Sequence, residues 1–280
     1  TLTRANTVVA RGTSALRRNC RRGAVPVRAS AGSEDAAEDQ KFFLRAPTVF
    51  EPYFGFGKRR TIRTELVKGC VWGFEQEQRL ANISTNLRMV VVKLSSGGLW
   101  VHAPLAPTRE MLRLVEELDA PVEYIVCPTF GLEHKVFFGP WGRKFPEAKC
   151  FQVEGLWSFP IDLPPALLGY RVDGEIVDGE PAPWGDEIEH CVLRTANVGS
   201  GPLVEATFLH KPSKTLIVTD ALIKVPAKVP EIISESQLRD TLLAGEEDPP
   251  LTPRERLIAW KQQTLLVCFF GTAPPDFFRP

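Results

Sequence analysis

The stretch from residue 86 to residue 127 limits the possible folds of this chain more than any other segment does. Its pattern predicts, in order, a β-branched strand at 89–94, a glycine turn at 95–98, a returning strand at 99–102, a helix capped by Thr108, and an apolar strand at 122–127. The last strand is short and apolar enough to be buried on both faces. A helix between two strands implies a crossover and a parallel pair, so the sequence predicts a layered α/β domain.

Weaker patterns extend this prediction on both sides. We expect an outer strand at 61–67, irregular aromatic-rich chain in the rest of 41–85, short strands at 149–153 and 191–194, and a hairpin of strands 204–209 and 215–219. Two late helices follow. One begins at a capping box of Ser234 and Gln237, and the other begins at Thr252 with proline in its first position.

Positive charge is concentrated at the start of the chain. Residues 1–33 contain seven arginines, no lysine and no acid, among serine, threonine and alanine. This is the composition of an organelle transit peptide, and residues 27–31 look like a plastid processing site. A disordered basic tail with another role is the alternative.

The rest of the chain has the composition of a globular domain. Hydrophobic residues make up 44% of the sequence and charged residues 24%, which are ordinary values. We divide the chain into a transit-peptide-like segment at 1–33, an acidic linker at 34–44 and a single domain at 45–280. Residues 276–280 resemble a truncated end, so one expectation is that the domain continues beyond them.

Charge argues against a nucleic-acid partner, and hydropathy argues against a membrane-spanning segment. Outside residues 1–33 the chain has 27 basic and 34 acidic residues, and such an acidic body argues against binding nucleic acid. The longest apolar run near the end covers 265–270, whereas a membrane-spanning helix needs about 20 residues, so we predict no transmembrane segment. A small molecule or another protein is the expected partner.

The cysteines do not mark a site. There are six, none forms a CxxC pair, and we expect most of them to be buried small residues. A redox-sensitive pair is the alternative. Cys127 ends a predicted strand, and a nucleophilic role for it would need a base such as His102.

The order of elements around residues 122–134 and 215–220 is similar to that of the metallo-β-lactamase superfamily. In that superfamily, the loop after the buried strand carries a metal motif, His-x-His-x-Asp-His, and a later strand ends in an aspartate that bridges two metals. The resemblance assigns the motif, in order, to Thr129, Gly131, Glu133 and His134, and the bridging aspartate to Asp220. The first metal site therefore loses both leading histidines, and no histidine follows His210 to complete the second.

Three segments resemble a narrower family, the domain-of-unknown-function family numbered 4336. They are residues 97–104, 183–187 and 208–220, and the resemblance extends over roughly residues 45–270. It implies a metallo-β-lactamase-like layered αββα sandwich with mixed sheets. The family occurs largely in photosynthetic organisms, so the resemblance also implies a chloroplast protein, in the stroma or associated with thylakoids.

Register counting separates the candidate site residues from the other histidines. If His210 pairs with Thr215 across the second hairpin, Asp220 faces Glu205, roughly 16 Å from His210. His210 is then expected to order its own turn. His102, the loop after residue 127 and Asp220 each follow the end of a strand, where ligands bind in such folds. We therefore predict one cluster at the sheet edge, which contains His102, Thr129, Glu133, His134, Glu205 and Asp220.

Two functions remain open for this cluster. In the first, it is a degenerate relic, and the protein is a non-hydrolytic pseudo-enzyme or binding module. In the second, Glu133, His134 and Asp220 hold one divalent ion (zinc, iron or manganese) in a hydrolase or oxidoreductase. A third hypothesis is assembly at the thylakoid surface through exposed aromatic residues of 41–85.

Overall fold

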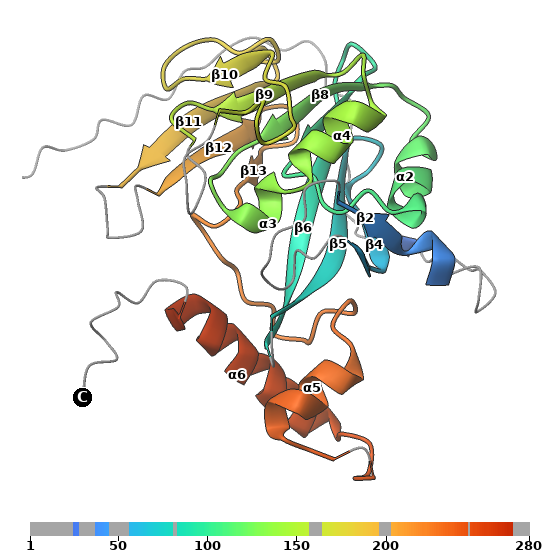
Figure 1. Ribbon diagram of the computed structural model, residues 1–280. Coiled ribbons are helices and arrows are strands. Elements are labelled where there is room, and N and C mark those ends of the chain that lie inside the picture. Colours follow the sequence, from blue (N-terminus) through green and yellow to red (C-terminus); the bar gives the residue numbers. More distant parts are fainter. Residues whose placement is uncertain are drawn as a thin grey trace, which may run out of the picture.

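The computed structural model describes residues 25–27, 37–44, 56–80, 83–156, 164–195, 203–245 and 247–270. These residues form two packed β-sheets, a separate two-stranded ribbon, and helices around them (Figure 1). Of the segment at 1–33, predicted to be disordered, the structure describes only residues 25–27, and these form a strand that pairs with residues 63–65. The rest of that segment, the boundary at residue 33 and the end of the chain after residue 270 lie outside the described residues. These expectations stay predictions. In the described part of the chain, no helix is long and apolar enough to span a membrane.

An eight-stranded mixed sheet forms the centre of the molecule. Its order is β1-β4-β5-β6-β7-β8-β9-β10. The strands are β1 Val25–Val27, β4 Thr61–Val67, β5 Val71–Leu80, β6 Ile83–Lys93, β7 Leu99–His102, β8 Val122–Cys127, β9 Lys149–Val153 and β10 Gly174–Ile176. Pairs from β1 to β7 are antiparallel, and pairs from β7 to β10 are parallel. The predicted crossover between residues 99 and 127 is confirmed.

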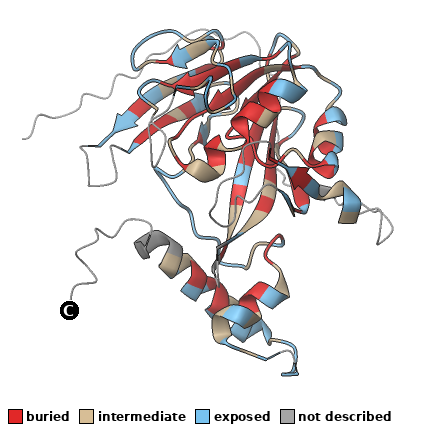
Figure 2. Cartoon of the chain, in the orientation of Figure 1, coloured by how far each residue is buried: buried red, intermediate tan, exposed pale blue. Residues whose placement is uncertain are grey.

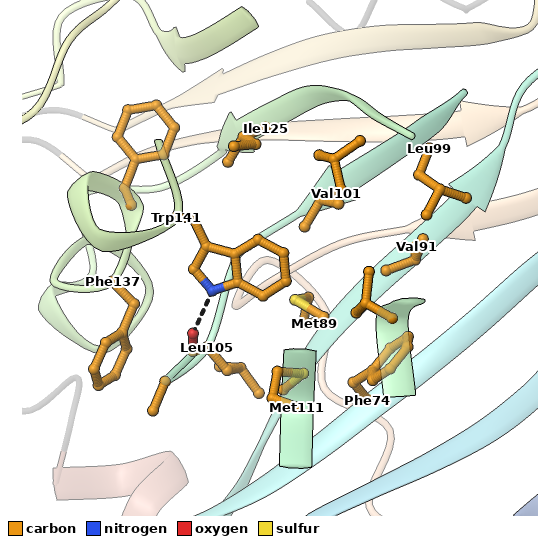
Figure 3. Close-up of a cluster of buried hydrophobic side chains, with 14 of the residues drawn as sticks. Phe74, Met89, Val91, Leu99, Val101, Leu105, Met111, Ile125, Phe137 and Trp141 are labelled. Atoms are coloured by element: carbon orange, nitrogen blue, oxygen red, sulfur yellow. Dashed lines mark hydrogen bonds between the residues drawn. The ribbon is translucent and has the colours of Figure 1, made fainter. Parts of the chain in front are cut away.

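Helices cover one face of this sheet. They are α2 Arg109–Glu116, α3 Leu132–Lys135 and α4 Phe138–Lys144. Thr108 caps α2 as predicted, because its side chain accepts a hydrogen bond from the Met111 N–H. The core beneath the helices is apolar, and Figure 3 shows Trp141 of α4 reaching into it. The indole Nε1 of Trp141 donates to the Leu105 carbonyl oxygen at 2.7 Å, so this buried donor is satisfied.

A second, three-stranded antiparallel sheet packs on the other face. It consists of β11 Ile188–Arg194, β12 Val204–His210 and β13 Thr215–Ile217. Alternate residues of β12 and β13 point inward and form a second core with Trp100 and Trp184. The layered α/β sandwich predicted from sequence is confirmed, with a mixed large sheet and an antiparallel small one. The outward residues Leu209 and Leu216 stay exposed.

The two sheets are joined by backbone hydrogen bonds at one edge. β13 pairs with β12 only as far as the Phe208–Ile217 pair. Beyond that point the chain after β8 takes its place: Thr129 forms an antiparallel bridge with Glu205, and the Ala206 N–H donates to the Pro128 carbonyl at 2.8 Å. The loop after the buried strand is thereby fixed against the second sheet.

The last two helices form a separate arm. α5 Glu235–Leu242 and α6 Pro253–Phe270 pack at the far end of the β5–β6 hairpin, away from the three-stranded sheet (Figure 1). Ile62, Leu238 and Trp260 belong to the small core that holds them, and Figure 2 shows this buried strip inside the arm. Ion pairs between Arg60 and Glu231 and between Arg79 and Asp240 lie around it.

Sequence reasoning was wrong at three places in the fold. Residues 71–80, expected to be irregular, form β5, which pairs with β6 over ten residues. The predicted capping box at Ser234 is absent, because the Ser234 hydroxyl lies against Glu77 instead, whereas the box of Thr252 and Glu255 is present. Residues 132–135, expected to be loop, form α3.

The segment between residues 37 and 60 is partly core and partly exposed. Phe42 and Leu44, at the end of the predicted linker, pack in the helix-covered core, which the acidic composition of 34–40 did not indicate. Strands β2 Lys41–Phe43 and β3 Phe56–Lys58 form a ribbon on which Phe43 and Phe56 are 71% and 78% exposed. Aromatic residues of 41–85 are thus partly packed and partly exposed, and assembly through them stays a prediction.

Candidate metal centre

Glu133, His134 and Asp220 meet at the edge where the two sheets join. One ligand atom from each of the three lies within 4.8 Å of the others. Glu133 and His134 come from the single turn of α3, in which the amides of His134 and Lys135 bond to the Gly131 carbonyl. Asp220 follows β13. The sequence placed these three residues together, and the structure brings them together.

Glu205 has a supporting role in this arrangement. Its two carboxylate oxygens accept hydrogen bonds from the backbone N–H groups of Thr219, Asp220 and Ala221, at 2.7 to 2.8 Å. Register counting had placed Glu205 opposite Asp220, and the contact forms through this side chain after β13 has ended. Because its oxygens are already bonded to backbone, Glu205 positions Asp220 and is a poor candidate for a metal ligand.

The carboxyl group of Asp220 lies in an unfavourable electrostatic environment. Loss of hydration raises its pKa from the ordinary value to about 6. The charge of His134 opposes this rise, and the charges of Glu133 and Glu205 add to it. The residue as a whole has an exposed surface, but its carboxylate packs against these neighbours.

His102 lies at the end of β7, in the core between the two sheets. Its ring stacks on Trp100 with centroids 5.7 Å apart and meets the Phe208 ring edge-on at 5.5 Å. The residue is only 1% exposed, and neither ring nitrogen has a hydrogen-bond partner among the described residues. Burial, and to a smaller extent the charge of His134, lowers the pKa of His102 to about 3. The imidazole is therefore neutral at physiological pH.

Two more buried polar atoms near the cluster have no partner among the described residues. They are the Nδ1 of His134, whose side chain is buried, and the hydroxyl of Thr219. Buried polar atoms are nearly always bonded in folded proteins. A ligand bound at this edge could supply the partners that the polar atoms of His102, His134 and Thr219 lack.

Thr129 and Gly131 occupy the positions at which the metallo-β-lactamase resemblance expects histidines. Thr129 is buried, and its hydroxyl accepts a hydrogen bond from the Gly131 N–H at 3.4 Å. Thr129 belongs to the joint between the sheets. A Cβ added at Gly131 would lie 3.4 Å from the Glu133 carboxyl carbon and 3.5 Å from an Asp220 oxygen. A side chain at position 131 would therefore point toward the cluster.

The remaining histidines and Cys127 lie outside the cluster. His210 bonds through Nδ1 to the Ser213 hydroxyl at 2.6 Å, so it orders its own turn as predicted. His190 bonds through Nε2 to the Val177 carbonyl. Burial raises the pKa of the Cys127 thiol to about 12, so the thiolate that a nucleophile requires does not form at neutral pH.

The family to which this chain belongs follows from its match to a family model. The description of that family is "Domain of unknown function (DUF4336)", and the match covers residues 68–277. This chain is a member of the DUF4336 family. The match spans both sheets from β5 onward, the cluster and the helical arm. Among proteins with curated descriptions, no relative matches the chain.

Several solved structures are similar at low identity. A metallo-β-lactamase from Pontibacter korlensis shares 13% identity over 56% of this chain and 70% of its own, with a TM-score of 0.43. DIM-1 metallo-β-lactamase exposed to ceftazidime shares 12% over 57% and 68%, with a TM-score of 0.42. A metallo-β-lactamase from Staphylococcus aureus shares 9% over 73% and 54%, with a TM-score of 0.36. The architecture stated above rests on the layers of this chain itself.

Proposed function

We propose that this chain binds one divalent metal ion through Glu133, His134 and Asp220, and that the site serves ligand binding rather than two-metal hydrolysis. The observation that supports this most directly is the approach of the three donor atoms to within 4.8 Å of one another. Two carboxylates and one imidazole are donors that suit zinc, iron or manganese.

The buried polar atoms fit a metal ion at this place. The unpaired Nδ1 of His134 is available as a ligand, or as a donor to a second group if the other ring nitrogen binds the metal. Glu205 already bonds three consecutive amides. It fixes the backbone of Asp220, as supporting residues around metal sites do.

The donor set supports one metal and not two. Thr129 and Gly131 supply no imidazole at the positions that the resemblance assigns to histidines. Within the residues that the structure describes, no second group of three histidine, cysteine or carboxylate ligands is found. A binding module with a single ion is therefore better supported than a two-metal hydrolase.

Elemental analysis tests the metal site. The full chain is produced without a histidine tag and purified without chelator, beside His134→Ala and Asp220→Asn. We expect about one equivalent of metal in the unmodified chain and a loss of affinity of roughly a hundredfold or more in each variant. His190→Ala and Asp186→Asn are the matched controls, since both lie away from the cluster, and they should retain the metal. A metal content that is the same in all five proteins would contradict the proposal.

A single-metal hydrolase or oxidoreductase is the second candidate function. It is favoured by the number of donors, since three protein ligands leave a coordination position for water or substrate. A bound ion would lower the pKa of that water and so favour its ionisation to hydroxide. His102 lies near His134 and is neutral, so one of its two unpaired ring nitrogens can donate a hydrogen bond to a bound group and the other can accept one. Turnover of bis(p-nitrophenyl) phosphate or of p-nitrophenyl acetate that is lost in Asp220→Asn and retained in Asp186→Asn would favour this candidate over the binding module.

We also propose that the protein resides in a chloroplast. The arginine-rich, acid-free composition of residues 1–33 supports this location. A fusion of residues 1–44 to a fluorescent protein should enter plastids of leaf cells, and exchange of the seven arginines for glutamine should abolish import. Uniform cytosolic fluorescence of the unmodified fusion would contradict it.

A further inference from the structure

A cavity of about 320 Å³ lies on the helix-covered side of the large sheet, apart from the metal cluster. It is bounded by α4, by Cys150 of β9 and by the chain between residues 166 and 171. Its volume falls at the lower end of the range of small-molecule sites, roughly 300–1,000 Å³. The rings of Phe138 and Tyr170, with centroids 5.3 Å apart, form an aromatic wall.

Two glycines of α4 line this cavity. A Cβ at Gly139 would lie 3.0 Å from the Gly169 carbonyl oxygen, and a Cβ at Gly142 would lie 3.0 Å from the Cys150 sulfur. Either contact is closer than packing normally allows. The helix can therefore approach residues 150 and 169 this closely only with glycine at these positions, and this close packing fixes the wall of the cavity.

The charge of the lining is positive. Arg143 and Arg171 both line the cavity, and none of its lining residues is acidic. Arg143 donates to the Gly169 carbonyl at 2.6 Å, and Arg171 donates to the Pro146 carbonyl at 2.8 Å and pairs with Asp173. These bonds hold both guanidinium groups at the wall. Guanidinium groups fixed in this way favour carboxylate, sulfonate or phosphate oxygens.

We infer that this cavity binds a small organic anion with an apolar ring or chain, the apolar part against Phe138 and Tyr170 and the acidic group toward Arg143 and Arg171. Leu167 is 72% exposed in the turn that borders the opening, which adds apolar surface next to it. The inference is independent of the proposed metal site, because it uses none of the residues of that cluster.

Two fluorescent probes with the same aromatic frame test the inference. 8-Anilinonaphthalene-1-sulfonate carries an acidic group, and N-phenyl-1-naphthylamine lacks it. We expect saturable binding of the sulfonate to the full chain, at least tenfold tighter than that of the neutral probe. Ala166→Trp, which fills the opening from an exposed position, should abolish binding of both probes. Ala166→Leu is a milder second block, used if the tryptophan variant fails to fold.

The arginine contribution is separated by a neighbouring control. Arg143→Gln should weaken the sulfonate at least fivefold and the neutral probe less than twofold. Lys144→Gln removes the same charge from the next residue of α4, which does not line the cavity, and should change neither. Sulfonate binding that survives Ala166→Trp in a folded chain, or that is insensitive to Arg143→Gln, would overturn the inference. Metal content should be unchanged in all these variants, which keeps the two sites distinguishable.

Discussion

The two faces of the large sheet differ in how their buried ring nitrogens are bonded. On the helix-covered face, the indole of Trp141 donates to a backbone carbonyl (Figure 3). On the face toward the second sheet, the indoles of Trp100 and Trp184 and both nitrogens of His102 have no partner among the described residues. Unpaired buried groups cost stability and persist where they serve another purpose. The first face is organised for stability, and the second leads to the candidate metal centre.

The largest effect that would sharpen this comparison is expected at Glu205, a polar residue of the second sheet whose bonds are complete. Glu205→Ala leaves three partly buried amides without their acceptor and should lower the free energy of unfolding by about 2–3 kcal/mol. Glu189→Ala on the neighbouring strand removes an exposed acid and should change it by less than about 0.5 kcal/mol. Urea unfolding measures both. A loss below about 1 kcal/mol for Glu205→Ala would show that these bonds do not hold the edge.

The dependence of stability on pH should separate the two groups whose pKa values are most perturbed at this edge. Folding lowers the pKa of His102 to about 3. The unfolded chain therefore takes up a proton that the folded chain refuses, and stability falls as the pH drops from about 6.5 toward 3. Folding raises the pKa of Asp220 to about 6. Its contribution has the opposite sign, and stability rises as the pH drops from about 6 toward 4.

Two variants resolve these opposing contributions. His102→Phe should lose roughly 2 kcal/mol of the acid sensitivity between pH 6.5 and 4.5. Asp220→Asn should become more acid-sensitive over the same interval, by about 1 kcal/mol once solvent screening of this exposed residue is allowed for. Urea midpoints of the metal-free proteins, measured in the presence of a chelator at four pH values, give the slopes. Parallel profiles for all three proteins would mean that neither group is perturbed by folding.

The smallest effect compares the same substitution on the two faces. Trp141→Phe removes the donor from the Leu105 carbonyl, whereas Trp184→Phe removes an indole N–H that has no partner. Both lose similar ring volume, so the difference between them isolates the hydrogen bond. We expect Trp141→Phe to be the more destabilising by about 1 kcal/mol in thermal or urea unfolding. Equal losses would remove the distinction between the faces.

Local signals made part of this structure predictable. The turn at 95–98, the cap at Thr108 and the crossover to β8 each depend on residues close in sequence, and all three are present. The β5–β6 pairing was missed because the charges on these strands obscure the alternation. Arg88 and Glu75 form an ion pair across the two strands, so these charges belong to the hairpin. These charges make sense only once the partner strand β6 is known, and the sequence of β5 alone does not reveal that partner.

The candidate site was predictable where register decides it. A hairpin turn fixes the pairing of every later residue, so the count from His210 placed Asp220 beside Glu205. The role of Glu205 was not predictable, because an acid that bonds backbone amides looks in sequence like one that binds metal. The cavity beside α4 was missed entirely. The glycines at 139 and 142 were its available signal, and their meaning depends on a loop that is distant in sequence.

The joint at Thr129 has a consequence for how the molecule comes apart. β12 changes neighbours along its length, from β13 to the chain that follows β8. Glu133 and His134 belong to the first sheet's side of this seam, and Asp220 to the second's. A ligand bound by all three residues would link the two sheets where they join. At a free concentration of a hundred times its Kd, the ligand would raise the free energy needed to separate the sheets by about 2.7 kcal/mol. Unfolding should therefore be more cooperative when the site is occupied.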